Sequence, residues 1–283
     1  MCLAVPAMAL SAACLDGSKL ALNQQADAHK VSSHLHVQFS RAAEASNRAV
    51  MADTDDASAA AAGEARQATD AVARDIETLH ALLQDLNDRD ELQLLDAFST
   101  RFTHYRALDA DILPLAVENT NLKAQRLSFG PAQEAVSAFR HALEGVQRSG
   151  AAKTGLDAPA ATAIAALLEV QVLEARHIAE SDEAAMTKME EEMGASETAA
   201  RKALDAMKGV MPPAAAPGLA TAGAALDRFT AVNAEIVKLS RRNSNVRSLA
   251  LSLGKKRTVT AECDEFLQSL EETLAKHHFT ATR

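Results

Sequence analysis

Apolar and small residues recur at steps of three and four along most of the chain, which predicts long amphipathic helices. Such heptad spacing is typical of helices that pack side by side in bundles. Only Lys256 interrupts the clearest stripe. That stripe consists of Val246, Leu249, Leu253, Thr260, Cys263, Leu267, Leu270 and Leu274. A second stripe consists of Leu122, Phe129, Ala132, Val136, Phe139, Leu143 and Val146.

The two stripes belong to an internal repeat. Residues 112–130 (ILPLAVENTNLKAQRLSFG) and 236–254 (IVKLSRRNSNVRSLALSLG) align at a constant offset of 124 without a gap. Chance rarely gives this agreement, so the sequence indicates a duplication. The identical pairs are Ile112/Ile236, Leu115/Leu239, Asn119/Asn243, Asn121/Asn245, Leu127/Leu251, Ser128/Ser252 and Gly130/Gly254.

Each copy is expected to hold four helices. The Asn-Thr-Asn and Asn-Ser-Asn triplets at 119–121 and 243–245 favour helix N-caps, so we place a tight turn at each, with a continuous helix as the alternative. In copy one we expect helices at 17–62, 64–86, 91–118 and beyond the triplet. In copy two we expect them at about 158–193, 196–210, 219–242 and up to about 277. Gly130 and Gly254 fall inside helices, which suggests close approach of a neighbouring helix.

The predicted fold is therefore all-α, with two tandem up-down four-helix bundles. We expect the first bundle at residues 16–150 and the second at 151–283, with the Gly-containing stretch 149–155 as linker. Composition agrees, because 48% of the residues are hydrophobic but only 3% are aromatic. Ala, Leu and other strong helix formers dominate the composition, as in coiled coils and long helices.

Charge and cysteine content exclude several classes of protein. The formal net charge of -9 argues against a nucleic-acid binder, which needs a basic face. Cys2, Cys14 and Cys263 have no short pair spacing, so neither a disulfide framework nor a zinc site is expected. Cys263 takes the stripe position of Phe139 and is expected in the core.

The segment 1–15 is apolar and uncharged but shorter than a membrane-spanning helix. Three interpretations stay open: the end of a transmembrane helix whose start is missing, a signal-peptide core without its basic start, or the apolar start of a bundle helix. No other stretch is expected to span a membrane.

No catalytic constellation is present in the sequence, so we do not expect an enzyme. Glu-x-x-His occurs at Glu77/His80 and Glu174/His177, a spacing used by di-iron bundles. The two motifs fall on different expected helices, and a chain this rich in Glu produces such matches by chance. We therefore expect no metal and no other cofactor.

Two groups of side chains have both a binding and a plain structural interpretation. Arg41 and Arg48 lie seven residues apart on the first expected helix, where they could meet an anionic ligand or remain surface arginines. Met186, Met189 and Met193 share one helix face, which predicts a core stripe or an adaptable binding surface.

The repeated segment resembles the four-helix ligand-binding domain of bacterial methyl-accepting chemotaxis receptors. In that family a polar turn precedes a fourth helix with a Leu-x-Leu-Gly-like stretch. The matching residues here are 243–245 with 251–254, and 119–121 with 127–130, and residues 177–186 (HIAESDEAAM) resemble the family's first helix.

This resemblance implies a sensory region that binds a small solute in the periplasm or at the inner membrane and passes on a small helix shift. It implies a homodimer and a membrane link through an adjoining or truncated N-terminal helix. Amino-acid receptors of the family use arginines on the first helix, so Arg41, Arg48 and Arg176 are the candidate ligand contacts. The sequence contains no cytoplasmic methylated hairpin, so signalling would need another segment or partner. The alternative is an exported helical bundle that binds another protein and has no small ligand.

Overall fold

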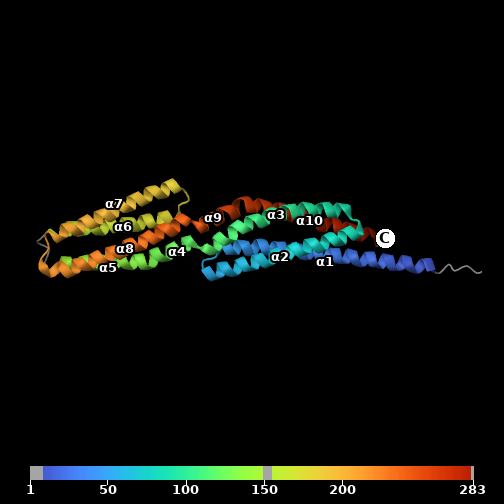
Figure 1. Ribbon diagram of the computed structural model, residues 1–283, viewed down its shortest axis with the longest axis horizontal. Helices are drawn as coiled ribbons and strands as arrows, with labels where there is room; N and C mark the ends of the chain where they lie inside the picture. The colour runs from blue at the N-terminus through green and yellow to red at the C-terminus, as the bar shows by residue number, and fades with distance from the viewer. Residues whose placement is uncertain (1–8, 149–154, 282–283) are drawn as a thin grey trace, which may run out of the picture. The chain divides into compact units, whose positions relative to one another are not determined.

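The computed structural model describes residues 9–148 and 155–281, and this part of the chain contains helices and no strand (Figure 1). The all-α prediction is therefore confirmed. The α-helices are α1 (Ala9–Met51), α2 (Asp55–Leu86), α3 (Arg89–Glu118), α4 (Thr120–Leu127), α5 (Gln133–Arg148), α6 (Asp157–Ala179), α7 (Glu183–Lys208), α8 (Ala216–Arg242), α9 (Ser244–Leu251) and α10 (Arg257–Ala281). Two π-helical turns, Ser128–Ala132 and Ser252–Lys256, and a 3-10 turn, Pro213–Ala215, complete the order.

The chain forms two compact units, which we call unit 1 and unit 2. Unit 1 contains residues up to Val117 and from Ser248 onwards, so its bundle consists of α1, α2, α3 and α10. Its core is a leucine stack around an aromatic cluster. Phe39 of α1 meets Phe98 of α3 edge to face, with ring centroids 5.7 Å apart. Alanines fill the narrow seam between α1 and α2, where the backbones lie close together.

Unit 2 contains residues Glu118–Arg247, with α4 and α5, α6, α7 and α8 as its four legs. One continuous apolar core joins all of them. Met186, Met189 and Met193 are at most 5% exposed, so the core interpretation of this stripe is confirmed.

The units differ from the division expected at residue 150. The fourth helix of each copy packs in the bundle that holds the first three helices of the other copy. Thus Phe139 and Leu143 of α5 belong to the core of unit 2, and Cys263 and Leu267 of α10 to that of unit 1. The tight turn expected at each triplet is therefore wrong, because the chain does not fold back there but leaves one unit and enters the other. The expected linker lies largely outside the described residues.

Both triplets do interrupt the helices, as predicted. Asn119 and Asn243 adopt the left-handed conformation, with φ of 51° and 54°. Within unit 2 the two triplets lie against each other. The Asn121 amide donates to Asn243 Oδ1 at 2.7 Å, and the Asn245 amide donates to Asn119 Oδ1 at 2.9 Å.

The π-helical turns correct the predicted stripes. Phe129 and Leu253 are 78% and 63% exposed, whereas their neighbours Ser128 and Ser252 are buried. A π turn accommodates an extra residue, which rotates the helix face and ends the simple heptad register. The expected close approach at Gly130 and Gly254 is wrong, because a Cβ at either position would meet no atom within 4 Å.

Two helix boundaries also differ from those predicted. The first helix ends at Met51, not near residue 62, and Thr54 caps α2 by accepting from the Ala57 N–H at 3.2 Å. The first helix of copy two ends at Ala179, and Asp182 caps α7 by accepting from the Ala185 N–H at 2.7 Å. Ala-rich periodicity continues through both breaks, so the sequence pattern did not indicate where these two helices end.

Helix α6 is long and apolar enough to cross a membrane by length and composition, contrary to the expectation that no stretch beyond the N-terminal segment would be. In the structure it is a leg of unit 2, with 39% of its apolar window buried. Residues 1–8 of the expected N-terminal apolar segment lie outside the described residues, and α1 begins at Ala9.

Candidate functional site

A buried charged cluster lies inside the bundle of unit 1. Lys256, at the end of the π-helical turn, is 2% exposed, and Asp109 of α3 is 4% exposed. Lys256 Nζ donates to Asp109 Oδ1 at 2.5 Å. Ser46 of α1 donates to the same oxygen at 2.7 Å and also contacts Lys256 Nζ. One carboxylate oxygen therefore joins three legs of the bundle.

Burial dominates the electrostatics of this cluster. It lowers the pKa of Lys256, while the Asp109 carboxylate opposes that change. Burial also raises the pKa of Tyr105, whose ring centroid lies 4.9 Å from Lys256 Nζ in a cation–π contact. A buried ion pair adds little net stability, because desolvation offsets its attraction, but loss of either partner is costly. Such a pair suits a specific or switching role better than a purely stabilising one.

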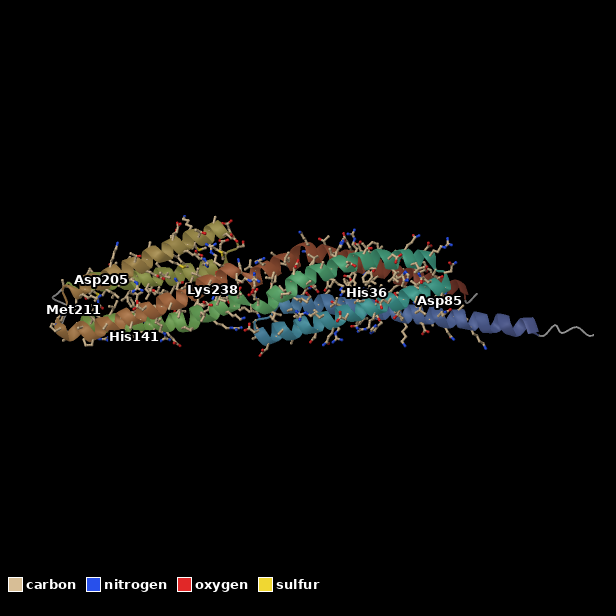
Figure 2. All side chains as sticks on the ribbon, in the orientation of Figure 1. His36, Asp85, His141, Asp205, Met211 and Lys238 are labelled. Carbon is tan, nitrogen blue, oxygen red and sulfur yellow. The ribbon has the colours of Figure 1, made fainter. Side chains whose placement is uncertain are left out.

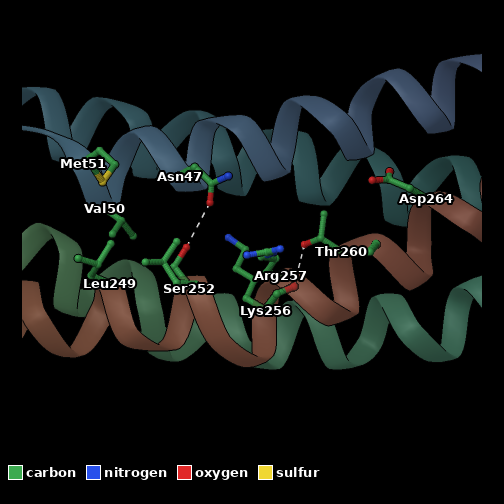
Figure 3. A pocket seen from close by; sticks show the side chains of 11 residues that line it. Asn47, Val50, Met51, Leu249, Ser252, Lys256, Arg257, Thr260 and Asp264 are labelled. Atoms are coloured by element: carbon green, nitrogen blue, oxygen red, sulfur yellow. Dashed lines mark hydrogen bonds between the residues drawn. The ribbon is translucent and has the colours of Figure 1, made fainter.

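A cavity of about 430 Å³ opens beside Lys256 (Figure 3). It lies between α1 and the segment that runs from α9 through the π-helical turn into α10. Ser252 donates to Asn47 Oδ1 across one end at 3.2 Å, and Thr260 donates to the Lys256 carbonyl at 2.9 Å. Arg257 and Asp264 add charge to walls that are otherwise largely apolar. The volume lies within the usual range of small-molecule pockets.

Asp109 also lines a second, smaller cavity, between α2 and α3. Its Oδ2 atom is buried and has no hydrogen-bond partner in the described part of the chain. The Tyr105 hydroxyl, which is also buried, interacts with this carboxylate, and the interaction raises the pKa of Tyr105 further. The ion pair therefore lies between the two cavities.

The candidate arginines are not brought together. Arg41 and Arg48 are exposed on α1, and Arg176 is exposed on α6 of the other unit. Arg48 pairs with Glu64, which raises the pKa of its guanidinium. None of the three lines either of the two cavities beside Lys256 and Asp109.

In each Glu-x-x-His motif the histidine lies close to a carboxylate of the protein. His80 lies 3.7 Å from Asp96, and the described residues contain no cluster of three potential metal ligands. Among the other histidines, His36 (Figure 2) links α1 to α10, with Nδ1 3.1 Å from Glu271 Oε2. Cys263 is fully buried as predicted, and burial raises the pKa of its thiol to about 12.

Unit 2 holds a polar network around the second motif. Glu174 is fully buried and accepts from Ser128 at 2.7 Å, and burial raises its pKa to about 7. His177 contacts Ser240 at 2.7 Å and Glu190 at 2.8 Å. Arg241 donates to Glu190 at 2.6 Å, and this bond lowers the pKa of Glu190. His177, Glu190 and Arg241 therefore bond to one another, whereas Glu174 Oε1 is buried and has no hydrogen-bond partner among the described residues.

One signal for the unit 1 site was present in the sequence. Lys256 is the residue that interrupts the apolar stripe, and a lysine at a seam position needs a buried partner. Ser46 and Asp109 were missed, because nothing in the sequence shows which remote helices meet Lys256.

Comparison with protein-family models, with curated proteins and with solved structures found no match for this chain. The resemblance to chemotaxis receptors therefore depends on the sequence pattern alone.

Proposed function

We propose that this chain is the sensory region of a chemoreceptor-like transmembrane signalling protein. A small solute binds in unit 1 and shifts the packing of its helices. The observation that supports this proposal is the Lys256–Asp109 pair, which joins three helices between two cavities. A ligand that changes the contacts of either residue changes how α10 is held against α1 and α3.

The π-helical turn fits such a role. Lys256 is its last residue and α10 follows directly, so movement of the lysine is passed to the helix. Single π turns are frequent at functional sites. Helix shifts of about 1–2 Å are a known means of signalling between helices.

A periplasmic or inner-membrane location and a homodimer remain part of this proposal. Sedimentation of the purified chain with and without ligand tests the dimer. The candidate contacts Arg41, Arg48 and Arg176 would take part only if a partner subunit completes a site around them.

A thermal-shift screen of the full chain against organic acids, amino acids and aromatic compounds tests the sensory role. A compound that binds only the folded state raises the melting temperature. Hydrogen–deuterium exchange with each hit should then change at residues 252–256 and around Asp109. The equivalent turn at 128–132 in unit 2 is the internal control and should not change.

Failure of every compound to shift the melting temperature would contradict the sensory role and favour the protein-interaction alternative. Equal exchange changes in both π-helical turns would also contradict it, because the proposed site exists in unit 1 only.

A further inference from the structure

The duplication relates the interiors of the two units residue by residue. Each buried residue of α1 between Ala28 and Val50 has a buried counterpart 128 positions later, in α6 or directly before it. The N-caps of α2 and α7, Thr54 and Asp182, are also 128 positions apart. Farther along, seven of the eight residues that line the cavity between α2 and α3 have counterparts 124 positions later in the lining of a cavity between α7 and α8. The offset falls because α2 has about one more helical turn before that cavity than α7 has.

This correspondence shows how the buried cluster of unit 1 differs from the equivalent place in unit 2. The serine on the first helix is replaced by a glutamate, the aspartate by an asparagine, and the lysine by an alanine. Unit 2 therefore has a carboxyl group from α6 at this place but no ammonium group from the chain. The equivalent pairs are Ser46/Glu174, Asp109/Asn233 and Lys256/Ala132.

Two oxygen atoms of unit 2 are left as unpaired acceptors. Glu174 is fully buried, and its Oε1 atom has no hydrogen-bond partner among the described residues. Asn233 of α8 is 5% exposed, and its amide donates to Glu197 Oε1 of α7 at 3.0 Å. That bond turns the carbonyl oxygen away from Glu197, and this Oδ1 atom is unpaired as well. Since buried acceptors are usually paired, the two oxygens indicate a missing donor.

The charge near these oxygens is negative. Burial raises the pKa of Glu174 to about 7, the Ser128 hydroxyl opposes the rise, and the charge of Glu197 adds to it. The cavity between α7 and α8, of about 320 Å³, is lined by Asn233 and Glu197 and by no lysine, arginine or histidine of the described chain. Its other carboxylate, Glu190, is already bonded to Arg241. The donor that fits this place is therefore a cation, and the cavity leads towards it.

The equivalent place in unit 1 shows which cation fits. The ammonium group of Lys256 bonds there to Asp109 Oδ1 and to Ser46, and it lies 4.9 Å from the centre of the Tyr105 ring. The counterpart of this tyrosine is Phe229, which is fully buried. A phenylalanine ring attracts a cation over its face as a tyrosine ring does. Two acceptor oxygens and an aromatic face thus recur in unit 2.

We propose that unit 2 binds an ammonium group, as the ammonium ion or as the head of a small primary amine, between Glu174 of α6 and Asn233 of α8. Its N–H groups bond to Glu174 Oε1 and Asn233 Oδ1, and the Phe229 ring covers it. The ligand supplies the group that Lys256 supplies in unit 1. Calcium fits less well, because it takes about six to eight oxygen ligands. This site is independent of the sensory site proposed in unit 1.

Thermal unfolding of the full chain at about pH 8 tests the inference, because Glu174 is then largely ionised. The chlorides of ammonium, methylammonium, potassium and tetramethylammonium are compared at equal ionic strength, so that general screening is the same in all four. Ammonium and methylammonium should raise the melting temperature saturably, by about 3 °C or more. Tetramethylammonium has the same charge without an N–H group and should have no such effect, and potassium should act at least about tenfold more weakly.

The two copies supply the test variants. Glu174→Gln keeps the size of the side chain without its charge and should weaken the response to ammonium at least about tenfold. Ala132→Lys places the lysine of unit 1 at the equivalent position and should abolish the response, since the chain then supplies the ammonium group. Glu191→Gln removes an exposed carboxylate of α7 outside the cavity and should leave the response unchanged. Far-UV circular dichroism verifies that each variant is folded.

Three outcomes would overturn the inference. The first is no saturable stabilisation by ammonium or methylammonium up to about 0.1 M. The second is equal stabilisation by all four salts or by potassium and ammonium, which would indicate screening or a site for any monovalent ion. The third is a response that Glu174→Gln leaves unchanged. Hydrogen–deuterium exchange separates this site from the sensory one, because ammonium should slow exchange at 128–132 and leave 252–256 unchanged.

Discussion

Thr120 and Ser244 lie 124 positions apart and cap each other's helices. The Thr120 N–H donates to Ser244 Oγ at 3.0 Å, and the Ser244 N–H donates to Thr120 Oγ1 at 3.0 Å. Asn121 and Asn245 repeat this exchange, with each N–H donating to the other's Oδ1 at 3.1 Å. Helix N-termini normally receive such bonds from a residue just before the helix. Here each copy supplies the caps of the other, so α4 and α9 depend on the duplication.

Replacement of both capping hydroxyls tests this dependence. Thr120→Ala and Ser244→Ala should each lower the free energy of unfolding by about 1–3 kcal/mol, because each leaves a buried N–H without its acceptor. The double variant should cost less than the sum, since the two groups also bond to each other at 3.2 Å. Urea denaturation measures all three. Thr198→Ala, on an exposed face of α7, is the control and should change stability by no more than about 0.5 kcal/mol. Full additivity would show that the bond between the two hydroxyls adds nothing, and single variants that change stability no more than the control would contradict mutual capping.

The left-handed asparagines offer a matched comparison. Asn87 and Asn243 have φ of 58° and 54°, but Asn87 ends α2 in an exposed position. Asn243 accepts from the Asn121 amide and donates to the Glu180 carbonyl, both at 2.7 Å. Asn87→Gly should be neutral or slightly stabilising, because glycine adopts this conformation readily. Asn243→Gly should cost about 1–3 kcal/mol through the lost amide contacts. Equal effects in urea denaturation would show that only backbone conformation matters.

Local patterns predicted local structure well. Heptad spacing identified the helices, and the polar triplets marked real breaks. The methionine stripe and Cys263 are core residues, as their spacing indicated. The N-caps Thr54 and Asp182 were visible in the sequence, with acidic residues after them, but continuous Ala-rich periodicity outweighed them.

Contacts between distant segments were not predictable. A triplet that breaks a helix looks the same whether the chain turns back or continues into another bundle, so the exchange of fourth helices was missed. The π-helical turns were hidden because their extra residue leaves no mark in composition. Lys256 was visible as an interruption of its stripe. Its partners Asp109 and Ser46 lie 147 and 210 positions away, and only the fold brings them together.

Loss of the whole buried cluster of unit 1 should change the free energy of unfolding little, whereas loss of Lys256 alone should lower it strongly. Lys256→Met leaves Asp109 buried and charged, which should cost about 3–5 kcal/mol of unfolding free energy. The triple variant Ser46→Ala/Asp109→Leu/Lys256→Met removes the three polar groups that bond to one another and leaves the Tyr105 hydroxyl. It should recover most of that loss, since apolar replacements of buried ion pairs are often neutral or stabilising.

An exposed ion pair is the control for this comparison. Arg201 and Asp227 lie 2.6 Å apart with about half or more of each side chain exposed, so Arg201→Met should cost no more than about 1 kcal/mol. Guanidinium denaturation measures the series. A triple variant as unstable as Lys256→Met would show that the cluster is needed for stability.

Glu174 should make the stability of unit 2 depend on pH in the opposite sense to an ordinary paired carboxylate. Burial raises its pKa from 4.5 to about 7, with Ser128 opposing and the charge of Glu197 adding to the shift. The folded state therefore holds a proton that the unfolded state releases above pH 4.5. From this group alone, stability falls as the pH rises from about 4.5 to about 7 and is constant outside that window.

Glu174→Gln removes this titration. The variant should gain stability relative to the wild type across the same window, by about 3 kcal/mol in total, since each unit of pKa corresponds to about 1.4 kcal/mol. Urea denaturation at pH 4.5, 6 and 8 measures the difference. Glu191→Gln removes an exposed carboxylate of α7, is the control, and should change stability by no more than about 0.5 kcal/mol. A Glu174→Gln difference that does not change with pH would show that this carboxyl group is ionised in the folded state at the same pH as in the unfolded chain.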